Sequence, residues 1–281
     1  MNTNYLTFSY VLITLLLPLA SSTISYHPKH IPAIYVFGDS LVDSGNNNYL
    51  PILSNAKFPP YGIDFGGAKP TGRCTNGKTT VVYIAIHLGL PFVPPYLGLS
   101  KAQRNKITTG INFASTGSGA FFQKLTITFR GSRKFSSYLL KEFSLRLQKI
   151  YNLGARRFFT NNLAPLGCFP SFAPKPRPRG ECNENINREI SYYNNRLPNV
   201  LQKLQSQLPG FTFMHSDLYE SFMYLREIGY KYGISETWKP CANRNTHLFF
   251  DDHASQIANK IYATHCFIEK TICKPSGFKM L

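Results

Sequence analysis

Residues 34–48 read Ile-Tyr-Val-Phe-Gly-Asp-Ser-Leu-Val-Asp-Ser-Gly-Asn-Asn-Asn. The first four form a short apolar, β-favouring run, which is typical of a fully buried strand. Gly38 ends this run, so Asp39 and Ser40 fall at the carboxyl end of the strand, the edge at which open α/β sheets bind ligands. A serine held there by the strand stays reachable, as a nucleophile requires. The alternative is that Asp39 and Ser40 only cap a helix.

The run from Phe37 to Asn48 resembles the first block of the plant GDSL esterases/lipases, which belong to the SGNH hydrolases. The resemblance implies that Ser40 is the nucleophile and that its backbone N–H helps to bind an oxyanion. It also implies an α/β fold, a flavodoxin-like three-layer α/β/α sandwich around a mainly parallel sheet. The implied reaction is hydrolysis of a small-molecule or lipid ester, and it needs neither a cofactor nor a metal.

Residues 110–119, Gly-Ile-Asn-Phe-Ala-Ser-Thr-Gly-Ser-Gly, resemble the second block of this family, a strand that opens into a glycine-rich loop. The resemblance makes Gly117 the second oxyanion donor, because glycine lets a backbone N–H approach the developing charge closely. Thr116 replaces a glycine that is common in the family. Taken alone, the stretch is only a glycine-rich turn before a helix. Neither Ser40 nor Ser118 lies in a Gly-X-Ser-X-Gly turn, which argues against an ordinary α/β-hydrolase.

The third block of the family, Gly-X-Asn-Asp at the end of a central strand, has no counterpart here. The chain passes from Gly119 through Thr126–Gly131 directly to Ser137, and residues 153–168 then match the family again. The sequence therefore indicates an internal deletion that removes a central strand and its helix. The missing asparagine would be a third oxyanion donor, and losing one such donor costs about 10²–10³ in rate. An impaired or inactive homologue that at most binds acyl or cell-wall ligands is thus the alternative to an esterase.

Residues 247–258, His-Leu-Phe-Phe-Asp-Asp-His-Ala-Ser-Gln-Ile-Ala, resemble the family's fifth block, Phe-Trp-Asp-X-X-His-Pro-Thr, but the spacing is one residue short. That block supplies the base of the triad and the aspartate that holds its tautomer. The predicted base is His253. Asp251 is the first choice for its partner and Asp252 the second, and the alternative is an aspartate that only caps the next helix.

Periodicity predicts helices at residues 81–90, 135–151 and 183–208, with Pro198 bending the last, and strands at residues 157–161 and 211–217. His87 falls on the first helix, where a packed or surface histidine is expected. His215 and Asp217 end the second strand. That strand is structural in the family, so a catalytic pair there is the lesser alternative.

The chain has 281 residues with 31 Lys and Arg against 14 Asp and Glu, a formal net charge of +17. Such a balance can attract nucleic acid or other polyanions. The basic residues are scattered, however, and no zinc-finger or RNP-like motif occurs. A solvated basic surface is therefore favoured over nucleic-acid binding, and association with an anionic cell wall is a further hypothesis.

Residues 1–22 contain an apolar run that is short for a membrane span and is followed by small residues, which predicts a secretory signal peptide. The alternative is an uncleaved anchor. We expect one hydrolase domain at residues 30–275, secreted to the cell wall or apoplast without stable membrane insertion. Six cysteines follow, an even number that fits disulfides, with Cys168 and Cys182 as the first pair. Their spacing does not resemble a zinc site.

Overall fold

The computed structural model describes residues 31–52, 54–118, 133–176, 180–240, 246–269 and 271–276. The expected signal peptide and the stretch Thr126–Gly131 lie outside the described residues. Every described residue belongs to one unit, Ile31–Lys279. The chain is of the α/β class, with helices around two three-stranded sheets and a further parallel pairing at the N-terminal strand.

The N-terminal run pairs along one edge. Ile34 N–H donates to the carbonyl of Thr109 at 3.0 Å and Val36 N–H to that of Ile111 at 3.1 Å, in a parallel arrangement. Val36 is buried, but the side chains of Tyr35 and Phe37 are 58% and 54% exposed. The expectation of a fully buried strand is therefore wrong for one face, where both side chains remain more than half exposed.

One of the three-stranded sheets contains β1 (Arg157–Asn161), β2 (Thr212–Ser216) and β6 (Cys273–Ser276). β1 and β2 are parallel, and β6 runs antiparallel to β2. The predicted strands at residues 157–161 and 211–217 are thus confirmed to within a residue. Among the described residues no backbone hydrogen bond joins β1 to the strand at 34–36.

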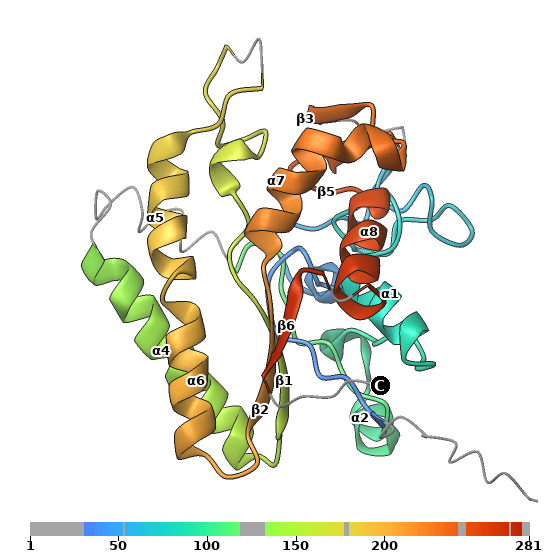
Figure 1. Ribbon diagram of the computed structural model, residues 1–281. Helices are drawn as coiled ribbons and strands as arrows, with labels where there is room; N and C mark the ends of the chain where they lie inside the picture. The colour runs from blue at the N-terminus through green and yellow to red at the C-terminus, as the bar shows by residue number, and fades with distance from the viewer. Residues whose placement is uncertain are drawn as a thin grey trace, which may run out of the picture. The chain divides into compact units, whose positions relative to one another are not determined.

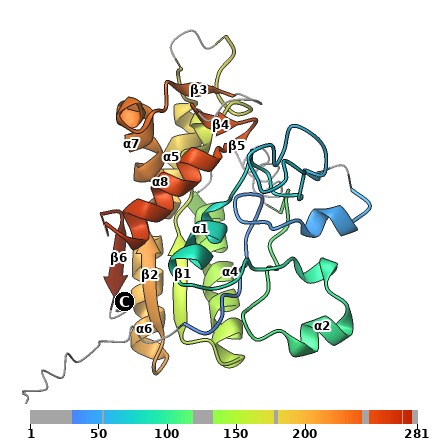
Figure 2. The same cartoon turned by 90° about the vertical axis from the view of Figure 1, so that its right-hand side faces the viewer.

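Helices cover both faces of the β1–β2 pair (Figures 1 and 2). On one side are α4 (Arg133–Asn152), α5 (Glu184–Asn194) and α6 (Leu197–Gln207), where Phe158 and Phe211 stack with ring centres 4.3 Å apart. On the other side Phe159 packs on Phe267 of α8 (Gln256–Phe267). The alternation of side chains along a strand explains why Phe158 and Phe159 reach opposite layers.

The remaining helices are short. α1 (Thr80–His87) packs on α8, α2 (Lys101–Lys106) precedes the strand at 109–113, and α7 (Leu218–Ile228) follows β2. Asp217 caps α7 and Ser255 caps α8, each by accepting a backbone N–H. The helix predicted at 183–208 is wrong as one element. It breaks between α5 and α6, because proline in the first turn of α6 suits a helix start.

The other three-stranded sheet comes from the C-terminal part of the sequence and contains β3 (Glu236–Pro240), β4 (His247–Phe250) and β5 (His253–Ala254). β3 and β4 are parallel, whereas β4 and β5 form a tight antiparallel hairpin. Leu248 and Phe249 of β4 are fully buried and pack with α7 and α8 in one apolar cluster. The hairpin is therefore anchored by its first strand.

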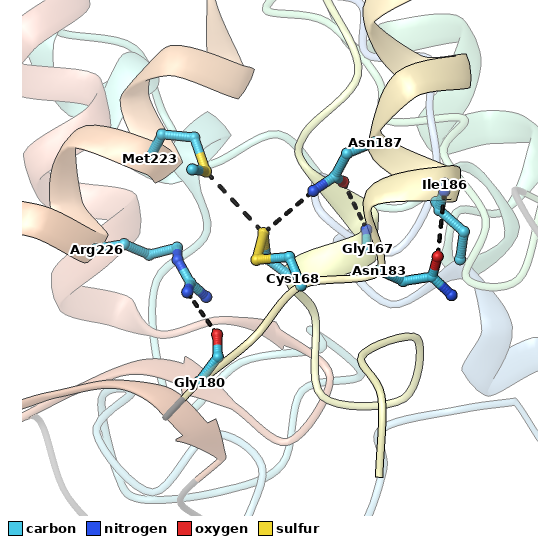
Figure 3. The surroundings of a disulfide bond; sticks show 9 residues. Gly167, Cys168, Gly180, Asn183, Ile186, Asn187, Met223 and Arg226 are labelled. Carbon is cyan, nitrogen blue, oxygen red and sulfur yellow. Dashed lines mark hydrogen bonds between the residues drawn. A yellow bond between two sulfur atoms is a disulfide. The ribbon is translucent and has the colours of Figure 1, made fainter. Parts of the chain in front are cut away.

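Cys168 and Cys182 form a disulfide, as expected, and Cys266 pairs with Cys273. Figure 3 shows the first disulfide beside Asn187, whose side chain accepts the Gly167 N–H at 2.9 Å and donates to the Cys168 sulfur at 3.4 Å. The bridge thus holds the loop after β1 against α5. No helix among the described residues combines the length and the apolarity that a bilayer crossing needs.

Candidate active site

Ser40 lies on a turn directly after the N-terminal strand. The Asp39 carboxylate accepts the Leu41 N–H at 3.0 Å, and the Asp39 carbonyl accepts the N–H groups of Val42 and Asp43. No helix begins at this point, so Asp39 and Ser40 do not form a helix cap. The aspartate instead closes the turn that presents Ser40, which is partly exposed.

A buried carboxylate connects this turn to the glycine-rich loop. Asp43 has no exposed surface. Its Oδ1 accepts the N–H groups of Gly45 at 2.7 Å and Asn46 at 2.8 Å, and its Oδ2 accepts both the N–H and the hydroxyl of Thr116 at 3.0 Å. Four donors offset the cost of burying this charge. The threonine that replaces a family glycine therefore adds a bond that glycine could not make.

Two asparagines of the first block bind the same loop. Asn46 Nδ2 donates to the carbonyls of Asn112 and Ala114 at 2.8 Å. Asn47 Nδ2 donates to the Thr116 carbonyl at 2.7 Å, and its oxygen accepts the Ser115 hydroxyl at 2.8 Å. These long-range bonds hold the two loops in one rigid unit.

The two predicted oxyanion donors lie on these adjoining loops. The Gly38 carbonyl accepts the Ser115 N–H at 3.1 Å and the Ser118 hydroxyl at 3.2 Å, which brings the second loop against the start of the Ser40 turn. Gly117 is exposed and has φ +85°, a conformation that favours glycine. Within the described residues neither the Ser40 N–H nor the Gly117 N–H donates a hydrogen bond to another backbone group.

The predicted acid and base lie on the β4–β5 hairpin. Asp251 and Asp252 form its two-residue tip, with Asp251 at φ +53°, and His253 returns opposite Phe250. The Asp251 carboxylate accepts the Tyr61 hydroxyl at 2.6 Å. The Asp252 carboxylate accepts the Ser171 N–H at 2.8 Å and also the Ser171 hydroxyl. Both aspartates are therefore bonded to groups other than the histidine.

His253 has an unusual environment. Its Nδ1 is buried and has no hydrogen-bond partner in the described part of the chain. Burial lowers the pKa of His253 from the ordinary value of 6.5, while the charges of Asp251, Asp252 and Asp39 act to raise it. The aspartates thus influence the ring through space, and neither accepts a hydrogen bond from it. The hairpin tip, one residue shorter than the family's spacing, leaves both carboxylates pointing to other partners.

Two observations bring the Ser40 turn and the hairpin to the same region. The Asp39 carboxylate, which precedes Ser40, acts on the pKa of His253. In addition, Leu41 and Ala254, the residues that follow Ser40 and His253, line one cavity of ≈ 20 Å³. That volume accommodates about one water molecule. The structure therefore places the proposed nucleophile and base on neighbouring segments.

Two residues near the site were not singled out from sequence. Tyr61 fixes Asp251, and burial together with this hydrogen bond raises the pKa of Tyr61. Cys74 is buried with its sulfur 3.2 Å from the Thr116 hydroxyl, and burial is the main cause that raises its pKa to about 11. The Cys74 thiol is therefore protonated at neutral pH and is no nucleophile. Both contacts join distant segments, so no local sequence pattern marks them.

The other histidines considered from sequence have structural surroundings. The His87 ring on α1 packs against Phe267 of α8, with ring centres 6.0 Å apart. Asp217, the possible partner of His215, instead caps α7 and accepts the Asn162 side chain at 2.8 Å. In the described ranges there is no cluster of three or more His, Cys, Asp or Glu residues that could hold a metal ion.

A model of the family described as GDSL-like lipase/acylhydrolase matches residues 127–265, a range that contains Asp251 and His253 but not Ser40. Similar proteins from Arabidopsis thaliana include GDSL esterase/lipase At2g04020, 34% identical over 335 aligned positions that cover 94% of this chain and 97% of that protein. GDSL esterase/lipase 7 is 32% identical, covering 86% of this chain and 89% of its own. GDSL esterase/lipase At5g55050 is 33% identical, with 79% and 81% covered.

The alignment lengths also bear on the missing block. Ninety-four per cent of 281 residues is about 264, so about 70 of the 335 positions aligned with the first relative have no residue in this chain. For the second relative, 86% is about 242 residues out of 326 positions, which leaves about 84 positions empty. The chain is thus internally shorter than these relatives, in agreement with the deletion inferred from sequence.

Proposed function

Since the chain belongs to the GDSL esterase/lipase family, we propose that it is a serine esterase/lipase that hydrolyses carboxylic esters of lipid or acyl type. Ser40 is the nucleophile and His253 the base. The single observation that carries the proposal is that Leu41 and Ala254, the residues directly after Ser40 and His253, line one cavity.

In the proposed mechanism the Ser40 hydroxyl attacks the ester carbonyl while His253 accepts its proton. The N–H groups of Ser40 and Gly117 bind the negative charge that develops on the carbonyl oxygen. His253 then returns the proton to the departing alcohol, and water releases the acid from Ser40 by the same steps. A base must be neutral to accept a proton, and burial keeps His253 neutral at neutral pH because it lowers the pKa.

The aspartates have a weaker role in this proposal than in a complete triad. Asp251, our first choice, stabilises the imidazolium by its charge, and Asp252 is the second choice. The turnover is therefore slow compared with an enzyme whose aspartate bonds the histidine, and slower again without the third oxyanion donor of the missing block.

The test compares turnover of a short-chain nitrophenyl ester by the purified protein and by its Ser40→Ala variant. We expect the variant to lose all measurable activity above background. Ser118→Ala is the matched control, because Ser118 is an exposed serine on the neighbouring loop whose hydroxyl bonds the Gly38 carbonyl. Equal rates for the protein and Ser40→Ala would remove Ser40 as the nucleophile.

A second candidate is a catalytically impaired or inactive homologue that at most binds acyl or cell-wall ligands. The unpaired His253 Nδ1 and the missing third block favour it. A fluorophosphonate probe separates the two candidates. If it fails to label Ser40 in a monodisperse, protease-resistant preparation, the inactive form is correct. Labelling at Ser40 supports the esterase.

The wider organisation is also part of the proposal. Residues 30–275 form one hydrolase domain with a flavodoxin-like three-layer sandwich that lacks a central strand. Residues 1–22 are a signal peptide, and the mature protein is secreted to the apoplast, where its net charge of +17 favours the anionic cell wall. N-terminal sequencing of protein from the apoplastic fluid tests this. A mature chain that begins near residue 23 is expected, and one that retains Met1 contradicts secretion by cleavage.

A further inference from the structure

One face of the N-terminal strand is exposed and aromatic. We define the aromatic face as the side chains of Tyr35, Phe37, Tyr96 and Phe113. Tyr35 is 58% exposed and Phe37 54%, which is unusual for rings on a strand. Their neighbours Ile34 and Val36 point to the opposite side, into an apolar cluster with α1. The strand is therefore packed on one face and open on the other.

Three rings of this face, those of Phe37, Phe113 and Tyr96, form a continuous row. Phe37 and Phe113 stack with centres 5.2 Å apart and an interplanar angle of 9°. Phe113 lies 5.0 Å from Tyr96, and the Arg104 guanidinium lies over the Tyr96 ring at 4.2 Å. Arg104 also donates to the Leu99 carbonyl at 2.9 Å, which fixes its place. An apolar row that ends in a fixed cation is thus built into the surface.

The charged residues on α2 and on the chain segment that carries Tyr96 and Phe113 have one sign. Helix α2, which carries Arg104, also bears the exposed Lys101 and Lys106 and no acidic residue. No Asp or Glu occurs anywhere between Asp64 and Glu142. A partner must therefore combine apolar groups that can accept aromatic rings with negative charge at its surface.

We propose that the aromatic face and α2 form a docking surface for an anionic lipid surface. Aromatic rings insert at the boundary between headgroups and acyl chains, while cations on the same side attract anionic headgroups. Phe37 lies three residues before Ser40, so the docking surface begins close in sequence to the proposed nucleophile. The docking proposal does not depend on hydrolysis. Vesicle binding by a chain that does not turn over esters would still support it.

The test measures co-sedimentation of the full chain carrying Ser40→Ala with two kinds of vesicle. One is phosphatidylcholine alone, and the other contains roughly 30% phosphatidylglycerol as the anionic lipid. We expect binding to the anionic vesicles that weakens as salt is raised, since exposed charges are screened. Absent binding, or equal binding to both vesicles at all salt concentrations, overturns the proposal.

A first comparison tests the charges, with two double variants that change the net charge of the chain by the same amount. Lys101→Glu with Lys106→Glu should weaken binding by at least about 20-fold, because each cation near an anionic bilayer contributes about fivefold in affinity. Lys203→Glu with Lys231→Glu, two exposed lysines away from the face, should weaken it less than about threefold. Equal losses would show that only net charge matters, and the proposed surface would be wrong.

A second comparison tests the rings. The double variant Tyr35→Ser plus Phe37→Ser is measured beside a control double variant, Tyr138→Ser plus Tyr230→Ser, whose residues are 53% and 68% exposed. The first pair should lose about tenfold or more in vesicle binding and the control almost none. A Phe37→Trp variant adds a direct readout, since brominated lipid should quench its added fluorescence. Absent quenching contradicts insertion of this ring.

Three other outcomes would also overturn the proposal. If Tyr35→Ser with Phe37→Ser lowers the urea midpoint far more than the control pair, the rings are covered by the protein itself. If these substitutions convert a dimer to a monomer, the face is an interface between two copies of the chain. If single-stranded DNA binds the face in preference to anionic vesicles, the row stacks on bases instead.

Discussion

The two sides of the candidate site differ in how their carboxylates are bonded. On the nucleophile side, the Asp43 carboxylate receives four hydrogen bonds and the asparagines after it join two distant loops. On the base side, His253 Nδ1 has no partner in the described part of the chain, and both adjacent aspartates bond elsewhere. The turn that carries the proposed nucleophile is thus held by a bonded carboxylate, whereas the proposed base has no carboxylate bonded to it.

The comparison predicts that stability resides on the nucleophile side. Asp43→Ala should lower the free energy of unfolding by about 3–5 kcal/mol, because it leaves buried donors without an acceptor. Urea unfolding followed by circular dichroism measures this change. Glu227→Ala is the control, since Glu227 is an exposed residue of α7, and its cost should stay under about 1 kcal/mol. Similar losses for the two variants would mean that the Asp43 network is not a stability centre.

On the base side, restoring the family's spacing should increase activity. Insertion of one alanine between Asp252 and His253 places Asp251 three residues before the histidine and lets a carboxylate orient the ring. We expect kcat/KM for a nitrophenyl ester to rise about tenfold or more, since the aspartate partner is worth up to about 10⁴ in a complete triad. An alanine inserted between Gly66 and Gly67, in an exposed loop, should change nothing. A folded insertion variant with unchanged activity would show that the spacing is not what limits the base.

A smaller effect is expected for the threonine that links the two loops. Thr116→Val keeps the shape of the side chain but removes the hydroxyl that bonds Asp43 and contacts Cys74. Its cost should be about 1 kcal/mol in unfolding free energy, the usual net worth of one hydrogen bond. Thr108→Val, at an exposed site, is the control. Identical midpoints would indicate that the hydroxyl adds nothing to the network.

The smallest expected effect is on the pH dependence of the esterase rate. His253 accepts a proton only when neutral, and its pKa lies below 6.5 because burial outweighs the nearby carboxylates. The esterase rate should therefore rise with pH through a value below 6.5 and stay level above it. Asp251→Asn removes a charge that raises this pKa, so the rising limb should shift to still lower pH. Asp64→Asn should leave it in place. A limb centred above 6.5 would contradict the buried, neutral histidine.

The sequence predicted the elements whose signals are local. The apolar strands at residues 157–161 and 212–216 and the helix around residues 135–151 have clear periodicity, and the adjoining loops of Ser40 and Gly117 followed from family blocks. The missing third block also agrees with the shorter alignment and with the absence of described pairing between the strand at 34–36 and β1.

The rest depends on contacts between distant residues. Asp43 meets Thr116 across 73 positions and Tyr61 meets Asp251 across 190, and no periodic pattern encodes either pair. The exposed rings of Tyr35 and Phe37 were expected to be buried, because an apolar run indicates a strand but does not show whether both of its faces are covered. The partners of Asp251 and Asp252 depend on how a two-residue turn directs its side chains, which spacing alone does not determine.

The most direct test of the central claim is the rate at which a fluorophosphonate labels Ser40 in the protein and in His253→Ala. If His253 is the base for Ser40, the protein should be labelled at Ser40 at a rate that falls as the pH drops below 6.5, and His253→Ala should react about 10³-fold more slowly with no such pH dependence. Equal labelling rates in the two proteins, at any pH, would show that the serine and the histidine do not act together.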